Sequence, residues 1–577
     1  MPFARVGAGL PGRPEEWAAR EEGTVGNMAE VVAARLRGAG VDRVYGVPGP
    51  ALDPLLRALG APWFVQARGA ESAALMACAH AKLTGRLGCC LAPPGAGVLR
   101  LLGGLYDAAA DRAPVLALAG RADGDPAVRH LSEVSVFCEP VSRPERLPDA
   151  LDRAVRAALT ERGVASLVVP RHVLEATAPS GPAGDGGPEP ARSRGGPDER
   201  RLRRAAGVLA AGRRPAVVLG NAGRAAAAQA AGVASLLGAG VAVTALARDA
   251  LPDDLPYQAG VVGRLGSAAA ATLLEECDTL LLVGAEDLDP VVLPAPGRCR
   301  TVAVEPEDSP RAAAVRAAGE PSPDAAVRVT GDPSAALEAL IPLLRRSTDR
   351  AWRDRVEDTV RTWRAEGRAK ADRYFGTSVN PRSVVAELSE RLPDRAVVVT
   401  DSGTALDWWT RHLRLRNGMR SLLSGHLGLP GAAVPYAVAA KFAVPERPVI
   451  ALVGDGAFQG GGLNELITVR RHLAFLSGLP PLVFCVLNNG DLNRLTWQRR
   501  AAAGDPLIPL SAEVPAMPYA EWARLAGLPA VRCDRPRHVA SVWADVLTRP
   551  GPVLLEFVVD AEIPPDWAAV ATSAAVA

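Results

Sequence analysis

The chain has 577 residues, which is too long for a single hydrophobic core and predicts about three domains. Its 65 Lys and Arg nearly balance its 63 Asp and Glu, so nucleic acid and anionic membranes are not expected partners, whereas small molecules and other subunits are. The eight cysteines are scattered and form no C-x-x-C pair, which favours a reduced, cytoplasmic protein. Residues 1–23 contain no signal-like apolar stretch, and no apolar run reaches about 18 residues, so we expect a soluble protein.

Residues 24–178 alternate between helical and strand patterns. Asn27 is expected to cap a helix whose apolar residues follow helical spacing and which ends at Gly38–Gly40. The next predicted elements are strands at 43–47 and 63–66, a helix at 71–83, and strands near 89 and at 115–118. This alternation predicts a parallel sheet with helices on both faces. A Pro- and Gly-rich stretch after Ala178 predicts a linker over 179–198.

Two more alternating blocks follow the linker. The block 199–345 begins with a predicted helix near Glu199 and contains the predicted strands 216–219, 279–283 and 301–304. A strongly charged stretch, 349–373, predicts an exposed connecting helix within 346–377. The block 378–565 begins near Asn380 and contains the predicted strands 396–399, 449–453, 482–487 and 553–558. The expected fold class is therefore α/β, with three doubly wound parallel-sheet domains.

The most informative segment follows the predicted strand 449–453 and reads Gly454-Asp455-Gly456-Ala457-Phe458. Glycines let the backbone approach an anion, N–H groups at a helix start can hold diphosphate oxygens, and Asp is a hard oxygen ligand for Mg²⁺. Alone, such a segment is more often an ordinary turn. Asn488-Asn489 follows the next predicted strand, at the sheet edge where parallel sheets place ligands. The two segments together favour a metal site over two plain loops.

Gly-Asp-Gly followed by Asn-Asn after a strand resembles the fingerprint of thiamine-diphosphate enzymes. The similarity extends over almost the whole chain and includes the segments 24–50, 104–108, 113–117, 168–170 and 331–332. The chain thus resembles the pyruvate oxidase and acetolactate synthase family, and it looks most like quinone-linked pyruvate oxidase and related unassigned thiamine-diphosphate enzymes. The resemblance implies a pyrimidine-binding domain, a central domain and a diphosphate-binding domain, in this order.

The same resemblance implies thiamine diphosphate and Mg²⁺ as cofactors. Asp455 and Asn489 would bind Mg²⁺ through their side chains, and Asp491 through its carbonyl. The implied contacts of the organic cofactor come from three loops: Asp401, Gly403, Thr404, Gly428, Pro430, Gly454, Gly456, Ala457 and Phe458. The implied substrate is a 2-oxo acid whose fragment passes to an acceptor. A homodimer or homotetramer is implied because the family builds each site from two subunits.

Two positions depart from the family pattern where the cofactor is activated. The family's Arg-His-Glu is Arg68-Gly69-Ala70 here, so Ala70 stands in place of the Glu that assists activation. Glu71 lies one residue further on, which is a rotation of about 100° on a helix. Glu71 replaces the family Glu if the helix starts differently, and otherwise it is a solvated or capping residue.

The second departure lies in the family's Gly-x-Met-Gly turn, whose Met supports the bent cofactor and donates its N–H to the pyrimidine. This chain has Gly428-Leu429-Pro430-Gly431. Proline has no backbone N–H, so this hydrogen bond is expected to be lost. His426, close by, is either a proton carrier or, more simply, an incidental loop histidine.

The central block leaves FAD binding open, because the turn 220–223 either approaches a phosphate or is only structural. The sequence after Pro565 has no long amphipathic tail, so a membrane is not an expected partner. The leading hypothesis is an enzyme that decarboxylates a 2-oxo acid. Its rival is a cofactor-binding paralogue that has lost this chemistry and acts as a regulatory or assembly subunit, which Ala70 and Pro430 favour.

Overall fold

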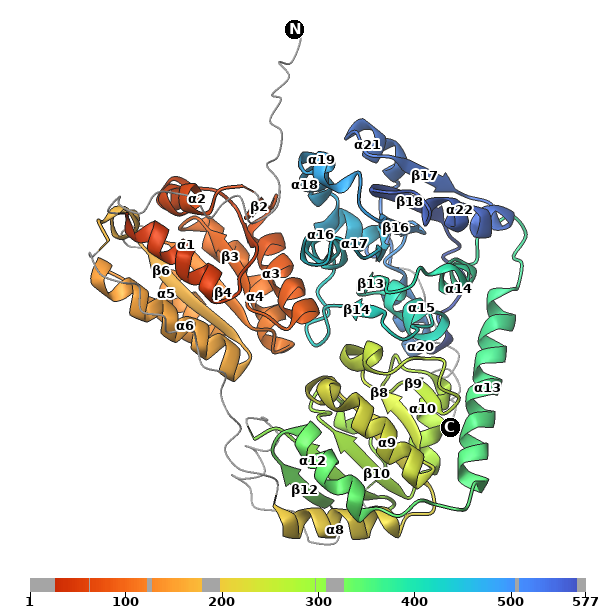
Figure 1. Ribbon diagram of the computed structural model, residues 1–577. Helices are drawn as coiled ribbons and strands as arrows, with labels where there is room; N and C mark the ends of the chain where they lie inside the picture. The colour runs from red at the N-terminus through yellow and green to blue at the C-terminus, as the bar shows by residue number, and fades with distance from the viewer. Residues whose placement is uncertain are drawn as a thin grey trace.

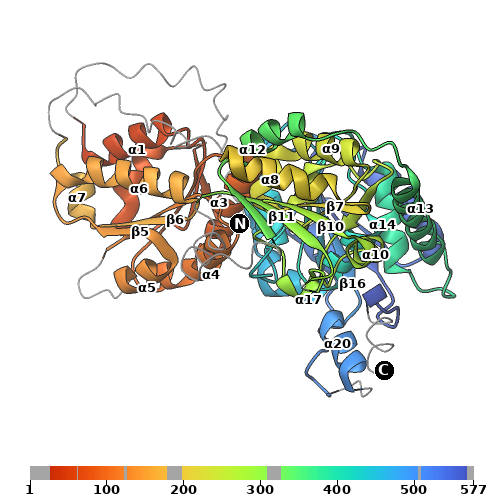
Figure 2. The same ribbon diagram turned by 90° about the horizontal axis from the view of Figure 1, so that it is seen from below.

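The computed structural model describes residues 26–61, 63–121, 127–178, 198–295, 297–307, 326–503 and 508–567. They form three α/β blocks, each built on a six-stranded sheet whose strand pairs are parallel (Figure 1 and Figure 2). The predicted fold class is therefore confirmed. The expectations for residues 1–23 and for the linker, up to residue 197, fall outside the described residues.

The first sheet has the strand order β2-β1-β3-β4-β6-β5. Asn27 caps α1 as expected, because its side chain accepts the N–H of Glu30 at 3.1 Å. The elements of this block are α1 Met28–Gly38, β1 Val44–Gly46, α2 Asp53–Leu59, β2 Phe64–Gln66, α3 Ala70–Thr84, β3 Gly88–Ala92, α4 Ala96–Ala110, β4 Val115–Gly120, α5 Ala127–Val134, β5 Ser135–Pro140, α6 Leu147–Glu161, β6 Val164–Val169 and α7 Arg171–Glu175.

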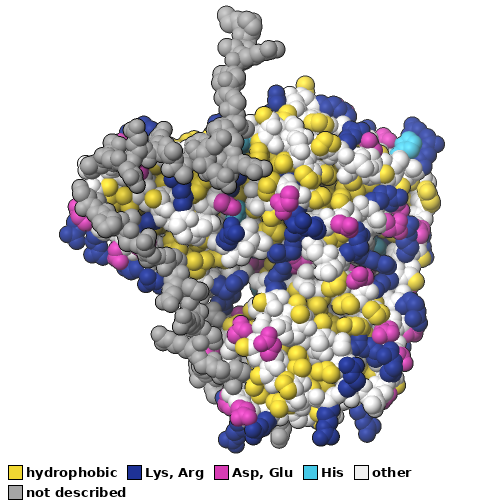
Figure 3. Space-filling view, viewed as in Figure 1, with side chains coloured by type: hydrophobic (Ala, Val, Ile, Leu, Met, Phe, Trp, Pro, Cys, Tyr) yellow, Lys and Arg dark blue, Asp and Glu magenta, His cyan; other side chains and the backbone are white. Residues whose placement is uncertain are grey.

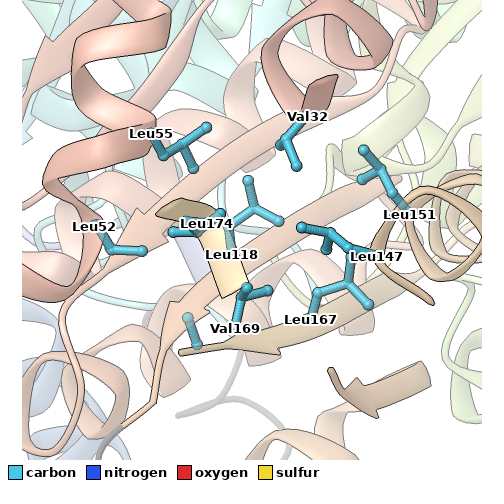
Figure 4. A pocket seen from close by; sticks show the side chains of 10 residues that line it. Val32, Leu52, Leu55, Leu118, Leu147, Leu151, Leu167, Val169 and Leu174 are labelled. Atoms are coloured by element: carbon cyan, nitrogen blue, oxygen red, sulfur yellow. The ribbon is translucent and has the colours of Figure 1, made fainter. Parts of the chain in front are cut away.

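Apolar side chains fill the space between the first sheet and the helices on one of its faces. Val32 of α1, Leu55 of α2 and Leu118 of β4 point toward one another, as Figure 4 shows. The void between them is only about 10 Å³, close to the minimum that one water molecule requires. This void is therefore part of the core packing and offers no room for a ligand.

The second sheet has the order β12-β11-β10-β7-β8-β9. Its elements are α8 Glu199–Ala210, β7 Pro215–Leu219, α9 Ala227–Leu237, β8 Gly240–Val243, β9 Gln258–Val261, α10 Ala268–Glu276, β10 Thr279–Val283, β11 Arg300–Glu305, β12 Ala326–Thr330 and α12 Pro333–Leu340. The connecting helix α13, Ala351–Ala371, runs from this block to the third one (Figure 1). The expectation that it is exposed is corrected on one face, because Trp352, Val356 and Val360 lie one turn apart and are buried against the second block.

The third sheet has the order β14-β13-β15-β16-β18-β17. Its elements are α14 Pro381–Arg391, β13 Val397–Thr400, α15 Thr404–His412, β14 Arg420–Leu422, α16 Ala433–Ala443, β15 Val449–Gly454, α17 Asp455–Ala457, α18 Glu465–Arg471, α19 Leu473–Leu476, β16 Leu482–Asn488, α20 Asn493–Ala503, α21 Tyr519–Leu525, β17 Ala530–Cys533, α22 Val539–Val546 and β18 Pro552–Val558. β15 lies between β13 and β16, so the loops after these three strands meet at one edge of the sheet.

The first and third blocks share one hydrophobic core. Helix α3 packs against α4 of its own block and against α16 of the third block. α3 and α16 are buried along most of their length, as expected of helices that are covered on several sides. The position of α3 is therefore tied to the sheet edge that carries the Gly-Asp-Gly segment.

Acidic and basic side chains are interspersed on the face that Figure 3 shows. This mixture fits the near balance of charge in the sequence. Among the described helices, none combines the length and the apolar composition that crossing a bilayer requires.

Candidate functional site

A pocket of about 300 Å³ opens at the carboxyl edge of the third sheet. Three loops meet there, because β13, β15 and β16 are neighbours and parallel. The lining includes most of the residues that the sequence predicted for this site: Gly403, Thr404, Gly428, Pro430, Gly454, Asp455, Gly456, Ala457, Asn489 and Asp491. Two loops that are far apart in the sequence are thus brought together as the strand pattern predicted.

Asp455 connects the loop after β15 to the loop after β16. Its Oδ1 accepts the N–H of Gly456 at 2.9 Å, and its Oδ2 accepts those of Asn489 at 3.0 Å and Gly490 at 2.6 Å. Burial raises the pKa of Asp455 to about 6, although these hydrogen bonds oppose the shift. Burial disfavours the ionised form of this carboxyl group, and a cation bound in the pocket would stabilise that form.

Asn489 and Asp491 follow β16 and line the same pocket. The Asn489 side-chain oxygen accepts the N–H of Asp491 at 3.1 Å. The Asp491 carboxylate accepts hydrogen bonds from two side chains of α20, Thr496 Oγ1 at 2.8 Å and Asn493 Nδ2 at 3.1 Å, which hold the loop against this helix. No group of three or more His, Cys, Asp or Glu that could hold a metal occurs in the described residues. The donors fit Mg²⁺ only when a ligand such as a diphosphate supplies further oxygens.

Two residues predicted for this site lie behind the pocket wall. Asp401 is 2% exposed, and its oxygens accept the N–H groups of Ser402, Gly431 and Ala433 at 2.8–2.9 Å. Burial raises the pKa of Asp401 to about 6. Phe458 is fully buried and packs edge-on against Tyr519. In this structure both side chains support the loops and neither lines the pocket.

The turn Gly428–Gly431 has almost no N–H group to offer. Leu429 N–H donates to Ser424 Oγ at 2.8 Å, and Gly431 N–H donates to Asp401 Oδ1 at 2.9 Å. Pro430 lies between them, lines the pocket and has no N–H at all. The structure therefore removes the simplest compensation, in which a neighbouring N–H would take the place of the one that proline lacks.

A π-helical turn, Phe458–Gly462, follows α17 and was not predicted. Its i→i+5 hydrogen bond joins Leu463 N–H to the Phe458 carbonyl at 2.8 Å. Gly461 in this turn faces Gly431, whose φ of +88° favours glycine, and a Cβ atom added to Gly461 would lie 3.1 Å from the Gly431 Cα. The run Gly460-Gly461-Gly462 is the signal in the sequence that could have indicated this backbone-to-backbone contact.

In this chain Ala70 and Glu71 lie outside the pocket at Asp455. Ala70 is 3% exposed at the start of α3, in the core shared by the first and third blocks. The loop before it is held by Arg68 N–H, which donates to the buried Glu465 carboxylate at 2.9 Å. Glu71 is an exposed residue that leans toward Gly103 of α4, and partial burial raises the pKa of its carboxyl group.

His426 is part of a polar network rather than an isolated loop residue. Its Nδ1 lies 2.9 Å from Asp111 Oδ1, and the other Asp111 oxygen accepts Lys82 Nζ at 2.5 Å. Burial raises the pKa of Asp111, but Lys82 and His426 outweigh it and hold this pKa well below its usual range. The network joins the first block to the loop that precedes the Gly428–Gly431 turn, a connection that no local sequence pattern signals.

The central block does not offer the open phosphate cradle that FAD would need at the turn 220–223. Asn221 N–H donates to Asp287 Oδ1 at 3.1 Å, and Thr244 Oγ1 donates to Asp287 Oδ2. A phosphate at this turn would need the hydrogen-bond donors that follow β7 and β8. The Asp287 carboxylate already accepts from both of them. Burial raises the pKa of Asp287, and two negative groups at one position would repel each other. The donor set therefore does not fit FAD phosphate at this turn.

Helix α20 forms one wall of the pocket, and the sequence analysis did not identify it. Asn493, Arg494, Leu495 and Gln498 line the pocket from this helix. Arg494 is held by a two-point contact with the buried Asp407 of α15, at 2.7 Å and 3.3 Å. A cation fixed beside the pocket in this way is suited to an anionic ligand group.

Three stretches of the chain match the domains of one known family. Residues 26–134 match a domain described as "Thiamine pyrophosphate enzyme, N-terminal TPP binding domain". Residues 202–340 match the central domain of the same enzymes, and residues 401–557 match their C-terminal TPP binding domain. The matched stretches cover the sheet edge with the pocket.

Several relatives are similar over nearly their whole length. The chain is 29% identical over 541 residues to the thiamine pyrophosphate-containing protein YdaP of Bacillus subtilis (strain 168), covering 91% of this chain and 90% of that protein. An acetolactate synthase of Mycobacterium bovis is 29% identical over 574 residues, with 92% and 88% covered. The acetolactate synthase isozyme 2 large subunit of Escherichia coli (strain K12) is 28% identical over 501 residues, with 82% and 85% covered.

Proposed function

The chain belongs to the thiamine pyrophosphate enzyme family, and from this premise we propose that it binds thiamine diphosphate with Mg²⁺ in the pocket at Asp455. The observation that carries the proposal is the junction of Asp455 with the Asn489 loop at one sheet edge. Asp455 and Asn489 would hold the metal through their side chains and Asp491 through its carbonyl. Gly454 and Gly456, which line the pocket without a side chain, would let the backbone approach the diphosphate closely.

We propose that the substrate is a 2-oxo acid, as the names of the acetolactate synthase relatives suggest. When bound, thiamine diphosphate supplies a nucleophilic thiazolium carbon for breaking the bond next to the substrate carbonyl. The chain's own contribution would be to hold the diphosphate end at α17, to place Gly428 and Pro430 under the cofactor, and to present Arg494 toward an anionic group. The fragment would then pass to an acceptor, in a protein that we expect to work in the cytoplasm.

A complete site would need a second copy of the chain. All residues that line the pocket come from the third block. Ala70 of the same chain is buried in the core between the first and third blocks, outside the pocket. We therefore propose that the first block of a partner subunit covers the pyrimidine end, in a homodimer or a homotetramer.

A second candidate function is a paralogue that binds the cofactor without activating it and serves as a regulatory or assembly subunit. The observation that favours it is the combined loss at Ala70 and Pro430. Neither a carboxylate at position 70 nor an N–H at position 430 is available, and the N–H groups on both sides of Pro430 are already engaged. This candidate keeps the same cofactor pocket and differs only in chemistry.

Calorimetric titration with thiamine diphosphate tests the binding proposal. We expect binding that requires Mg²⁺ and that Asp455→Ala abolishes, because the variant loses the carboxylate that would bind the metal through its side chain. Glu446→Ala, an exposed carboxylate away from the pocket, is the matched control and should bind as the wild type does. Failure to bind in the presence of Mg²⁺, or equal binding by Asp455→Ala, would contradict the proposal.

A decarboxylation assay with a panel of 2-oxo acids then separates the two candidates. Carbon dioxide release from at least one member of the panel by the cofactor-loaded protein supports the enzyme. A protein that is saturated with cofactor and releases none from any member supports the paralogue.

A further inference from the structure

A larger cavity lies where the second block, α13 and the third block meet. Its volume is about 640 Å³, which is within the range of small-molecule sites. It shares no lining residue with the pocket at Asp455. Its walls come from the segment after β8, from α13, from α14, and from the end of α15 with the segment that follows it. Nothing in the proposed thiamine-diphosphate function uses this cavity.

The wall of this cavity carries an excess of positive charge. It contains six arginines and only three carboxylates: Arg248, Arg364, Arg368, Arg411, Arg414 and Arg416, against Asp253, Asp254 and Glu390. Arg368 is neutralised by ion pairs with Asp372, Glu387 and Glu390. Arg411 and Arg416 also lie within 3.7 Å of a carboxylate, that of Asp407 and that of Asp394. The remaining wall charges are Arg248, Arg364 and Arg414 against Asp253 and Asp254, a small positive excess in a chain that is nearly neutral as a whole.

Arg248 is the most deeply buried of these arginines, at 2% exposed. Its Nη2 pairs with Asp253 at 3.3 Å and donates to the Leu413 carbonyl, while its guanidinium stacks 4.3 Å from the centre of the Trp409 ring. Within the described part of the chain, neither Nε nor Nη1 of Arg248 has a hydrogen-bond partner. Arg248 therefore brings to the cavity wall a buried positive charge that one carboxylate and one carbonyl satisfy only in part.

Arg364 of α13 and Arg414 of the segment after α15 add two like charges to the cavity lining. Arg364 donates to the carbonyls of Asp253 and Gln258 rather than to a carboxylate. Burial lowers the pKa of Arg364, and the charge of Arg414 adds to this shift while Asp253 and Asp254 oppose it. The Arg414 backbone is fixed by its N–H bond to Ser389 Oγ at 2.8 Å, so its side chain starts from a defined position at the cavity.

We propose that this cavity binds a polyvalent phosphate anion, either free or as the phosphate chain of a nucleotide. Guanidinium forks match phosphate oxygens in geometry, and a polyanion would place negative charge among Arg248, Arg364 and Arg414, which line one cavity. Trp363, which packs against the core of the second block, also lines the cavity and adds apolar surface to it. The bound anion would join the second and third blocks through α13.

Titration calorimetry of the full chain tests the proposal, with thiamine diphosphate and Mg²⁺ present to fill the other pocket. Pyrophosphate, ADP and adenosine are the probes. We expect saturable binding of pyrophosphate or ADP at one site per chain, no binding of adenosine, and weakening as salt is raised. Tighter binding of ADP than of pyrophosphate identifies a nucleotide as the natural source, and equal binding identifies the free anion. Absence of binding by both anions overturns the proposal.

Variants assign the binding to this cavity. Arg414→Gln removes one charge-assisted contact at an exposed position and should weaken anion binding about tenfold. The matched control is Arg346→Gln, an exposed arginine outside the cavity that removes the same charge, and it should bind as the wild type does. Equal losses in Arg414→Gln and Arg346→Gln would show non-specific attraction and overturn the proposal.

Discussion

Pro430 and the residues on either side of it determine what the Gly428–Gly431 turn can donate to a ligand. The turn is held from behind by Asp401 and Ser424, which accept the N–H groups of Gly431 and Leu429. Moving either N–H toward the pocket would leave a buried acceptor unsatisfied, at a cost of about 1–3 kcal/mol. The missing proline donor is therefore not replaced without rearrangement of the turn.

His426 and Asp111 give the junction of the first and third blocks a pH dependence. The Asp111 contact raises the pKa of His426, while burial opposes it. A raised folded-state pKa means that this stabilisation is fully present below the ordinary histidine pKa of about 6.5 and is lost as pH rises through the folded-state value.

We predict that His426→Gln lowers the urea midpoint of unfolding more at pH 6 than at pH 8.5. Because the His426 side chain is 42% exposed, screening limits the difference to less than about 1 kcal/mol. The exposed His538 provides the control, since His538→Gln should shift the midpoint equally at both values. Equal effects of His426→Gln at the two pH values would show that the pair does not stabilise the junction.

Most of the pocket residues could be predicted one by one, because a strand end and the polar residue that follows it can be recognised in a short stretch of sequence. Asp455 and Asn489 lie at adjacent strand ends as the pattern predicted. Asp401 and Phe458 show the limit of such reasoning. A sequence places a residue in a loop, but whether its side chain faces the ligand or supports the loop depends on neighbours such as Gly431 and Tyr519.

At the scale of elements, the contact between the π-helical turn and the Gly428–Gly431 turn is the part that periodicity could not reveal. A π-turn contains one residue more than an α-helical turn, so it rotates the residues that follow it about the helix axis. This extra residue produces no distinct hydrophobic pattern in the sequence. Regular elements were easier, because strands such as β10 and β15 are uniformly apolar and buried on both faces. The buried residues Trp352, Val356 and Val360 of α13 were not recognised as an apolar stripe, because most of the surrounding residues are charged.

We predict that Gly461→Ala weakens thiamine-diphosphate binding and lowers stability by about 1–3 kcal/mol, the usual cost of overpacking. The added Cβ would press against the Gly431 backbone, which cannot rotate away as a side chain can. Gly460→Ala is the matched control, because a Cβ at Gly460 meets nothing within 4 Å. Calorimetry and thermal unfolding should distinguish the two variants, and identical behaviour would mean that the close approach does not shape the pocket.

At the scale of the whole molecule, the three blocks could be predicted from composition and alternation, whereas their arrangement could not. The shared core of α3 and α16 and the polar network at Asp111 join segments more than 300 residues apart. No local pattern specifies such contacts. The same arrangement keeps Ala70 away from the pocket of its own chain, which is the basis for expecting a partner subunit.

We predict that the cofactor-loaded protein is a dimer or tetramer in multi-angle light scattering at micromolar concentration. A pocket lined by one block leaves the pyrimidine end uncovered in a single chain, so cofactor binding and association should be coupled. Titrating the protein concentration with and without thiamine diphosphate measures this coupling. A monomer with cofactor bound would contradict the two-subunit site.

The central claim is that this chain separates cofactor binding from cofactor activation. Exchange of the thiazolium C2 proton, followed by NMR after acid quench, measures activation directly in protein saturated with thiamine diphosphate and Mg²⁺. We predict slow exchange in the wild type and an increase on the order of 10²–10⁴ in Ala70→Glu/Pro430→Met, the usual contribution of a general acid or base. Glu71→Gln should leave the wild-type rate unchanged. Wild-type exchange as fast as in a relative that has the Glu, or its loss in Glu71→Gln, would contradict the account.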